Sequence, residues 1–301
     1  MLQTRTNKRD FMEDIAREAE NAASNQRMGQ IYQVTKQLSG KEAQVNMTIK
    51  DKNNNTLTTE REQYLRWKEH FQEVLNRKET DELVIIPEAP MDLEIVTDPP
   101  LKLEIQKAIK SLKNKKAPGT DQLNAELFKI DPVLAMDTLH PVFHKIWEKA
   151  VIPNSWTEGN IIRIPKSGDL TNCNSWRGIA LLSIPSEVFC IVLTSRITEV
   201  VDKKLRQEQA GFRKGIGCID HIFVLGNILE QCHEWQRKLL VNFVDFEKAF
   251  DSLHRDSLWE ILRNYGIPSK IEQLIKQFYT NFLCTINSEA DTNFLVKSGE
   301  R

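Results

Sequence analysis

The amino-acid sequence predicts a fold of the α+β (mixed α/β) class, and three observations predict it. Apolar residues recur at helical spacing in several segments, among them 101–112, 189–205 and 222–232. Two other segments, 161–164 and 239–246, are short apolar runs of the kind that form buried strands. Helical and strand patterns alternate along the chain, as they do in mixed architectures.

Length and composition describe an ordinary globular chain. It has 301 residues, of which 40% are hydrophobic and 28% charged, so it can hold about two domains and bury a core without disulfides. The longest apolar-leaning run, 178–193, contains too many polar residues for a membrane span, and the N-terminus does not read as a secretory signal. The five cysteines form no CxxC pair, which argues against a zinc ribbon or a disulfide framework. We therefore expect an intracellular protein that does not enter a membrane.

Charge is unevenly distributed, although the formal net charge is only −1. Residues 72–98 carry a net charge of −6, residues 102–129 carry +4, and residues 196–214 carry +3. A nearly neutral chain can therefore present a basic face to nucleic acid. Solvated helix surfaces are the plainer interpretation of the same pattern.

The first 97 residues are expected to form a helical extension and an acidic linker, followed by the main domain over residues 98–301. Residues 8–38 show helical periodicity, and residues 40–58 read as a loop or weak hairpin. A second helix is predicted from Thr59, where Glu62 completes a capping box. The acidic, proline-containing stretch 79–100 reads as a linker, and we see no chemistry in this extension.

Local signals mark several element ends in the main domain. The helix over 101–112 is expected to stop at 117–119, where the sequence is Ala-Pro-Gly. Two later helices are each predicted to begin with a capping box, Ser257 with Glu260 and Ser269 with Glu272, and the first of them to end at Gly266. Residues 283–297 read as a hairpin.

The sharpest local signal is a carboxylate at the end of an apolar strand. The apolar run at 239–246 (LLVNFVDF) carries Asp245 near its end, and an ionised carboxylate there needs a partner that balances its charge. A divalent metal, a lysine or a helix N-terminus could supply it, and structural ion pairs are commoner than metal sites. Asp251, close to a turn before a helix, is expected to act as a cap.

A second signal pairs a lysine with an arginine across a turn. Lys166 follows the strand predicted at 161–164, and Arg177 follows eleven residues later. Arginine offers a planar fork and lysine a point charge, so together they could grip a polyphosphate. An ordinary β-turn with two surface bases is the alternative.

Four motifs, in the same order along the chain, resemble the reverse transcriptase of non-LTR (LINE-type) retrotransposons. They are KNKKAPGTDQLNAELFK at 113–129, IPKSGDLTNCNSWRGIALLS at 164–183, QAGFRKG at 209–215 and FVDFEKAFDSLHRDSLW at 243–259. The resemblance spans about residues 97–301. It implies a right-hand polymerase fold with fingers and the first part of the palm, preceded by the N-terminal helical extension.

The resemblance also implies roles for individual residues. Asp245 matches the first catalytic carboxylate of an RNA-directed DNA polymerase, which with the backbone carbonyl of Phe246 would bind Mg²⁺, two ions in the complete enzyme. Lys166 and Arg177 match contacts to the incoming deoxynucleoside triphosphate, and Phe250 matches an aromatic ring that would exclude a 2′-hydroxyl. With Phe246 they make up the four residues that the resemblance assigns to nucleotide binding. Further contacts to phosphates of an RNA template and a DNA primer are expected from Lys113, Lys115, Lys116 and Arg213.

Two family features have no match among the 301 residues: a Gln-Gly motif and a hairpin with paired aspartates. We therefore expect a truncated chain that does not polymerise by itself. A non-catalytic relic, or a residual nucleic-acid-binding protein, is the alternative. An unrelated Mg²⁺-dependent nucleotidyltransferase would need a second carboxylate cluster. The sequence leaves the oligomeric state open.

Overall fold

The computed structural model describes residues 48–76, 86–286 and 289–296, together with positions 13, 14, 16, 17, 20 and 21. The chain separates into two compact units, residues 1–47 and 48–301. The six positions of the first unit are helical, as predicted, whereas the rest of the helix predicted over 8–38 lies outside the described residues. The domain boundary at 97/98 stays a prediction. The remaining description concerns the second unit.

A four-stranded mixed sheet carries the second unit. Its strand order is β2-β1-β3-β4, with bounds β1 Glu158–Pro165, β2 Trp176–Leu181, β3 Phe282–Ile286 and β4 Glu289–Val296. The β1–β2 and β3–β4 pairs are antiparallel, and β1 runs parallel to β3. The strand predicted at 161–164 and the hairpin predicted at 283–297 are thus confirmed, apart from their end residues.

One helix from the N-terminal third packs on this sheet. Helix α3 (Glu60–Leu75) begins at Thr59 with the predicted capping box and contacts β3 and β4. Buried Trp67 and Phe71 from α3 join Ile161 of β1 and Phe294 of β4 in one apolar cluster. Residues 48–58, just before α3, include a single bridge between Lys50 and Thr56, in keeping with the predicted weak hairpin.

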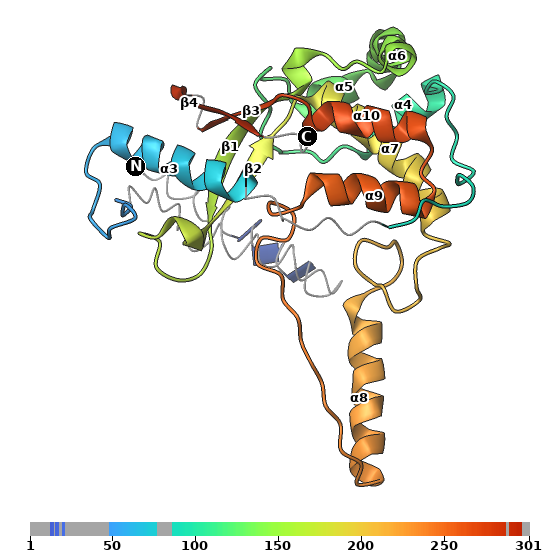
Figure 1. Cartoon of the computed structure of the whole chain (residues 1–301). Helices are drawn as coiled ribbons and strands as arrows, with labels where there is room; N and C mark the ends of the chain where they lie inside the picture. The colour runs from blue at the N-terminus through green and yellow to red at the C-terminus, as the bar shows by residue number, and fades with distance from the viewer. Residues whose placement is uncertain are drawn as a thin grey trace. The chain divides into compact units, whose positions relative to one another are not determined.

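Six of the other described helices and one 3₁₀ turn, Asn154–Trp156, build a second, larger core. The helices are α4 (Lys102–Ser111), α5 (Ala125–Ile130), α6 (Pro132–Lys149), α7 (Ile184–Val201), α9 (Arg255–Tyr265) and α10 (Ser269–Tyr279). A further 3₁₀ turn, Cys173–Ser175, instead places Cys173 in the first cluster. In Figure 1 these helices lie on the opposite side of the sheet from α3. Phe143 and Trp147 of α6 pack edge-on against Phe189 of α7 at the centre of this core. None of the described helices is both long and apolar enough to cross a bilayer.

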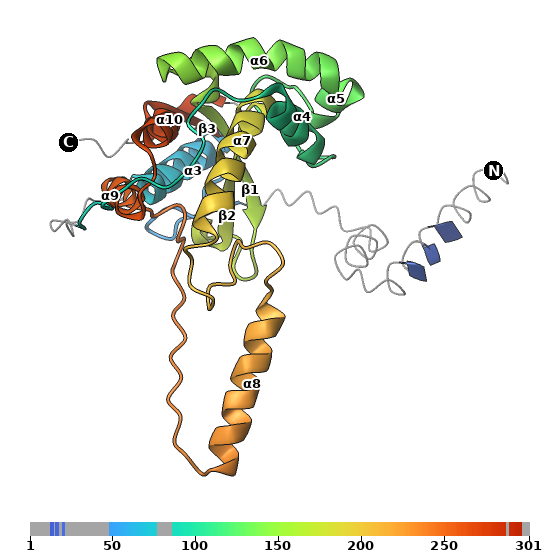
Figure 2. The same ribbon diagram turned by 90° about the vertical axis from the view of Figure 1, so that its right-hand side faces the viewer.

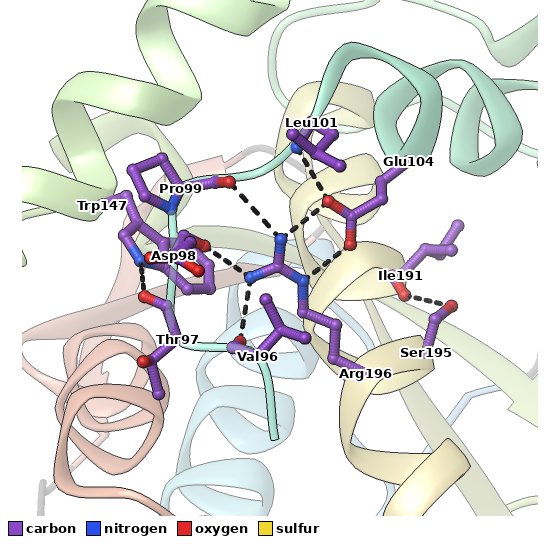
Figure 3. A network of polar contacts seen from close by, with 10 residues as sticks. All are labelled: Val96, Thr97, Asp98, Pro99, Leu101, Glu104, Trp147, Ile191, Ser195 and Arg196. Carbon is purple, nitrogen blue, oxygen red and sulfur yellow. Dashed lines mark hydrogen bonds and ion pairs between the residues drawn. The ribbon is translucent and has the colours of Figure 1, made fainter. Parts of the chain in front are cut away.

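The described part of the predicted linker, 86–100, forms neither helix nor strand, but it is firmly packed. Leu93 and Ile95 are buried in the helical core. We call residues 86–99 the strap. Arg196 of α7 binds it, because the Arg196 guanidinium donates to the carbonyls of Val96 and Asp98 and also to the Glu104 carboxylate of α4 (Figure 3). The four acidic residues of this stretch, Glu88, Asp92, Glu94 and Asp98, are exposed, so the apolar side chains between them and Arg196 hold it against the core.

The prediction of a buried strand over 239–246 is wrong. These residues are extended but belong to no strand, and side chains such as Leu240 and Phe243 are 100% and 84% exposed. They follow helix α8 (Cys218–Glu234), which buries none of its residues and projects away from the sheet (Figure 2). Among the described strands none pairs with this segment, so its amides and apolar side chains face water. A strand-like composition needs a neighbouring strand to become a strand.

Two capping predictions are also wrong. Helix α9 is capped by His254, whose ring nitrogen accepts from the Ser257 amide, and α10 begins after Pro268 without a side-chain cap. Glu260 and Glu272 instead form ion pairs with Arg263, at 2.7 and 2.8 Å. Arg263 of α9 thus binds both glutamates, Glu260 within its own helix and Glu272 on α10, and neither closes a capping box.

The five cysteines are free and differ in burial, which predicts an order of chemical modification. Cys218 is exposed, whereas burial raises the pKa of the Cys284 thiol to about 12. The thiolate is the reactive form, so iodoacetamide at pH 8 is expected to alkylate Cys218 rapidly and Cys284 only after unfolding. Peptide mass spectrometry over time checks this order, and Cys218→Ser should remove the fast phase. Equal rates at both cysteines would contradict the packing described here.

Candidate functional site

The β1–β2 hairpin places Lys166 and Arg177 at the same end of two paired strands. Arg177 lies opposite Ile164 in the ladder, and the amide of Lys166 donates to the Ser175 carbonyl at 2.8 Å. Gly168, with φ of +113°, makes the turn between them. The hairpin therefore holds the two cations at one end of the sheet.

Helix α3 packs closely against this hairpin. A Cβ atom on Gly178 would lie 2.5 Å from the ring of Phe71, so only glycine lets the helix approach β2 this closely. The Arg163 guanidinium of β1 lies 5.1 Å from the Trp67 ring, a cation–π contact that ties the helix to the strand.

A turn after residue 245 completes a pocket of about 480 Å³, which we call the basic pocket. Lys166 and Arg177 come from the hairpin, Phe246, Lys248, Phe250 and Asp251 from the turn, and His70, Phe71 and Val74 from α3. Its charged lining residues are three cations and one carboxylate, which makes it suited to an anion. All four residues expected to contact a nucleotide, Lys166, Arg177, Phe246 and Phe250, thus line one pocket.

Phe250 connects this pocket to another of the sequence motifs. Its ring meets that of Phe212 edge-on, with centroids 5.6 Å apart, although both rings are largely exposed. Phe212 belongs to the Gly211-Phe212-Arg213 motif, so two of the four motifs meet at this ring.

His70 and Lys248 belong to the basic pocket but were missed by sequence reasoning. The Lys248 Nζ atom lies 3.5 Å from His70 Nε2 and donates to Asn174 Oδ1 at 3.2 Å. Burial, and then the charge of Lys248, lowers the pKa of His70 to about 4. The capping box at Thr59 predicted the helix that carries His70, but nothing in the sequence placed α3 beside a site.

Asp245 stands next to the basic pocket in the chain but is not among its lining residues. Its side chain is exposed, and no three His, Cys, Asp or Glu side chains gather as potential metal ligands within the described residues. These residues therefore do not by themselves make a two-metal centre. Asp251 was predicted to cap a helix, and this prediction is wrong. It lines the basic pocket instead, and α9 starts only at Arg255.

The four residues expected to touch template or primer lie outside the basic pocket. Lys113, Lys115 and Lys116 are exposed in the loop after α4. Arg213 is held within its own segment by Asp202, at 2.7 Å, and by the Arg206 and Gln209 carbonyls. The three lysines are thus open to a phosphate, whereas Arg213 would have to exchange its present partners.

Comparison with known proteins defines the class. Residues 164–299 match the family described as reverse transcriptase (RNA-dependent DNA polymerase). The end of β1, the turn that carries Lys166, strand β2, the turn after Asp245 and the β3–β4 hairpin all fall within the matched range. These residues form a reverse transcriptase domain.

The relatives place this domain among those of non-LTR retrotransposons. The probable RNA-directed DNA polymerase from transposon BS of Drosophila melanogaster is 28% identical over 76% of this chain and 23% of its own length. The type-1 element R2 Pol polyprotein of Popillia japonica is 28% identical over 61% of this chain and 25% of its own. An uncharacterized 149 kDa protein of transposon TX1 from Xenopus laevis is 26% identical over 61% of this chain and 14% of its own. The chain thus spans at most about a quarter of these relatives, and it carries a reverse transcriptase domain of the non-LTR retrotransposon type.

Proposed function

We propose that this chain supplies the nucleotide-binding part of an RNA-directed DNA polymerase, and that the basic pocket receives the incoming deoxynucleoside triphosphate. The supporting observation is the convergence of Lys166, Arg177, Phe246 and Phe250, which come from two motifs, on one pocket. RNA template and DNA primer are the proposed partners, and the free cysteines favour an intracellular setting.

The chemistry of each side chain suits this ligand. Arg177 can hold two phosphate oxygens through its planar fork, while Lys166 offers a compact charge. Phe250 gives the pocket an apolar wall against which a sugar could rest, and a bulky ring there would collide with a 2′-hydroxyl. Lys113, Lys115, Lys116 and Arg213 are proposed to contact phosphates of the template or primer.

Family members generally use a divalent metal, and we propose that Asp245 and the Phe246 carbonyl contribute ligands to Mg²⁺ here. Oxygen ligands suit this hard cation. Two ions need more carboxylates than Asp245 alone, and the described residues do not supply them. The proposal therefore assigns Asp245 a share of the site rather than the whole of it.

A second function has one observation in its favour. The described residues gather no metal-ligand cluster, which would suit a chain that binds nucleic acid without catalysing polymerisation. Such a chain would bind RNA through its exposed lysines without binding deoxynucleoside triphosphates in the basic pocket.

Titration of the 301-residue chain with dATP separates the two functions. We expect Lys166→Ala and Arg177→Ala each to weaken dATP affinity by about tenfold or more, because each removes charge-assisted hydrogen bonds worth about 1.5–3 kcal/mol. Lys110→Ala, which removes an exposed lysine of α4 outside the pocket, should leave the affinity unchanged. RNA binding without measurable dATP binding, or equal dATP affinity in all variants, would favour the second function.

A further inference from the structure

The basic pocket contains a third cation that is held in place by two other segments. Lys248 projects from the turn after Asp245, where its backbone adopts φ of +51°. Its amine donates to Asn174 of the β1–β2 connection and lies within hydrogen-bond distance of His70 on α3. Three segments far apart in the sequence therefore meet at one ammonium group.

Both of these partners are polar groups that can accept a hydrogen bond without carrying a charge. The Asn174 side chain is an amide, and the His70 ring is neutral at pH 7 because burial and nearby cations lower its pKa to about 4. His70 is itself fixed by edge-on ring contacts with Trp67 and Phe71, at 6.1 and 5.2 Å. These two contacts therefore orient the Lys248 amine but do not cancel its charge.

We propose that Lys248 is a third phosphate-binding cation of the basic pocket, and that His70, together with Asn174, is the positioning residue that aims it. The inference rests on the proposed function and deepens it, because it names the anionic end of a polyphosphate as the group that Lys248 binds. It also gives α3, which precedes the matched range 164–299, a part in the site.

The placement of the three cations favours this role over a purely structural one. Lys166, Arg177 and Lys248 all line the basic pocket, and the charges of Lys248 and Lys166 both help to lower the pKa of His70. Like charges held together cost free energy unless negative charge lies between them, and Asp251 supplies the pocket with one carboxylate for three cations. A polyphosphate carries several negative oxygens and can accept from all three cations at once.

Inorganic tripolyphosphate and dATP are the probes for this proposal. Lys248→Met should weaken the binding of both by about tenfold, as expected for one lost charge-assisted contact, while Lys248→Arg should retain most of the affinity. His70→Ala should weaken binding by about threefold, which is less than the effect of losing one full hydrogen bond to a charged group. His70→Gln keeps a neutral acceptor and should restore the affinity, and Lys110→Ala is the matched control. Restoration by glutamine separates a positioning role from general loss of packing.

A double-mutant cycle tests the contact without any ligand. The unfolding midpoints of His70→Ala, Lys248→Met and the double variant should be non-additive, because the two side chains interact. Unchanged tripolyphosphate and dATP affinity in Lys248→Met, with Lys166→Ala still impaired, would overturn the inference and leave the proposed function standing. Additive midpoints would overturn the positioning role of His70. Absence of binding by the unmodified chain would overturn both the inference and the proposed function.

Discussion

Replacement of Arg196 by alanine is expected to lower the free energy of unfolding by about 3 kcal/mol, the lower end of the cost of breaking a buried ion pair. The Arg196 side chain is only 6% exposed and joins α7 to α4 and to the strap at 86–99. Its loss would remove the guanidinium donor from three backbone carbonyls and from the Glu104 carboxylate, which among the described residues would keep only the Leu101 amide (Figure 3). The estimate stays at the lower end because Glu104 remains 29% exposed and can regain water.

Arg196 also determines the ionisation of its partner. Burial by itself would raise the pKa of Glu104, but hydrogen bonds from Arg196 and the Leu101 amide outweigh it, and the pKa is lowered. This carboxylate therefore contributes stability above its unfolded pKa of about 4.3, and the contribution is lost as pH falls through the lower folded value. In Arg196→Ala the loss of folding stability at acidic pH should therefore be smaller.

Urea unfolding followed by circular dichroism measures both effects. Arg196→Lys keeps the charge but not the planar fork, so it should be intermediate. Arg206→Ala, which removes an exposed arginine, is the control and should stay within about 0.5 kcal/mol of the unmodified chain. A loss in Arg196→Ala no larger than that in Arg206→Ala would contradict the role given to this network.

Asp245→Asn is expected to lower nucleotide incorporation by at least about a thousandfold in any polypeptide that carries these residues and extends a primer on an RNA template. Removal of one member of a catalytic group commonly costs several powers of ten. Because the Asp245 side chain is exposed, the isosteric amide should not disturb packing. Template binding, measured by gel shift, should change little.

Glu247→Gln provides the matched control for this substitution. Glu247 is an exposed acid two residues away, and it does not line the basic pocket. Its loss should leave primer extension within about twofold of the unmodified rate, as for most surface changes away from a site. Full activity in Asp245→Asn, or an equal loss in both variants, would mean that Asp245 is not the metal-binding carboxylate.

Local periodicity predicted most of the described elements correctly. Strand β1, the β3–β4 hairpin and α3 follow from patterns within the segments themselves, whereas β2 was not predicted. The strand expected at 239–246 does not form, because a strand requires a partner that its own sequence cannot specify. The caps of α9 and α10 were misjudged because the helices begin after His254 and Pro268, and because Arg263 of α9 binds Glu260 and Glu272.

The candidate site was predicted in part for a similar reason. Lys166 and Arg177 were recognised from their spacing and family resemblance, and both line the basic pocket. His70 lies 178 residues from Lys248, and only tertiary packing through Gly178 and Phe71 brings α3 to the pocket. Long-range contacts of this kind leave no periodic signal in the sequence.

Hydrogen exchange of the 301-residue chain with and without saturating dATP tests the central claim most directly. Binding in the basic pocket should slow exchange in the hairpin turn at 166–175 and in the turn at 247–252, and in Lys166→Ala/Arg177→Ala this protection should disappear. Protection confined to other segments, such as α8, or no protection in either turn, would contradict the assignment of this pocket to a nucleotide.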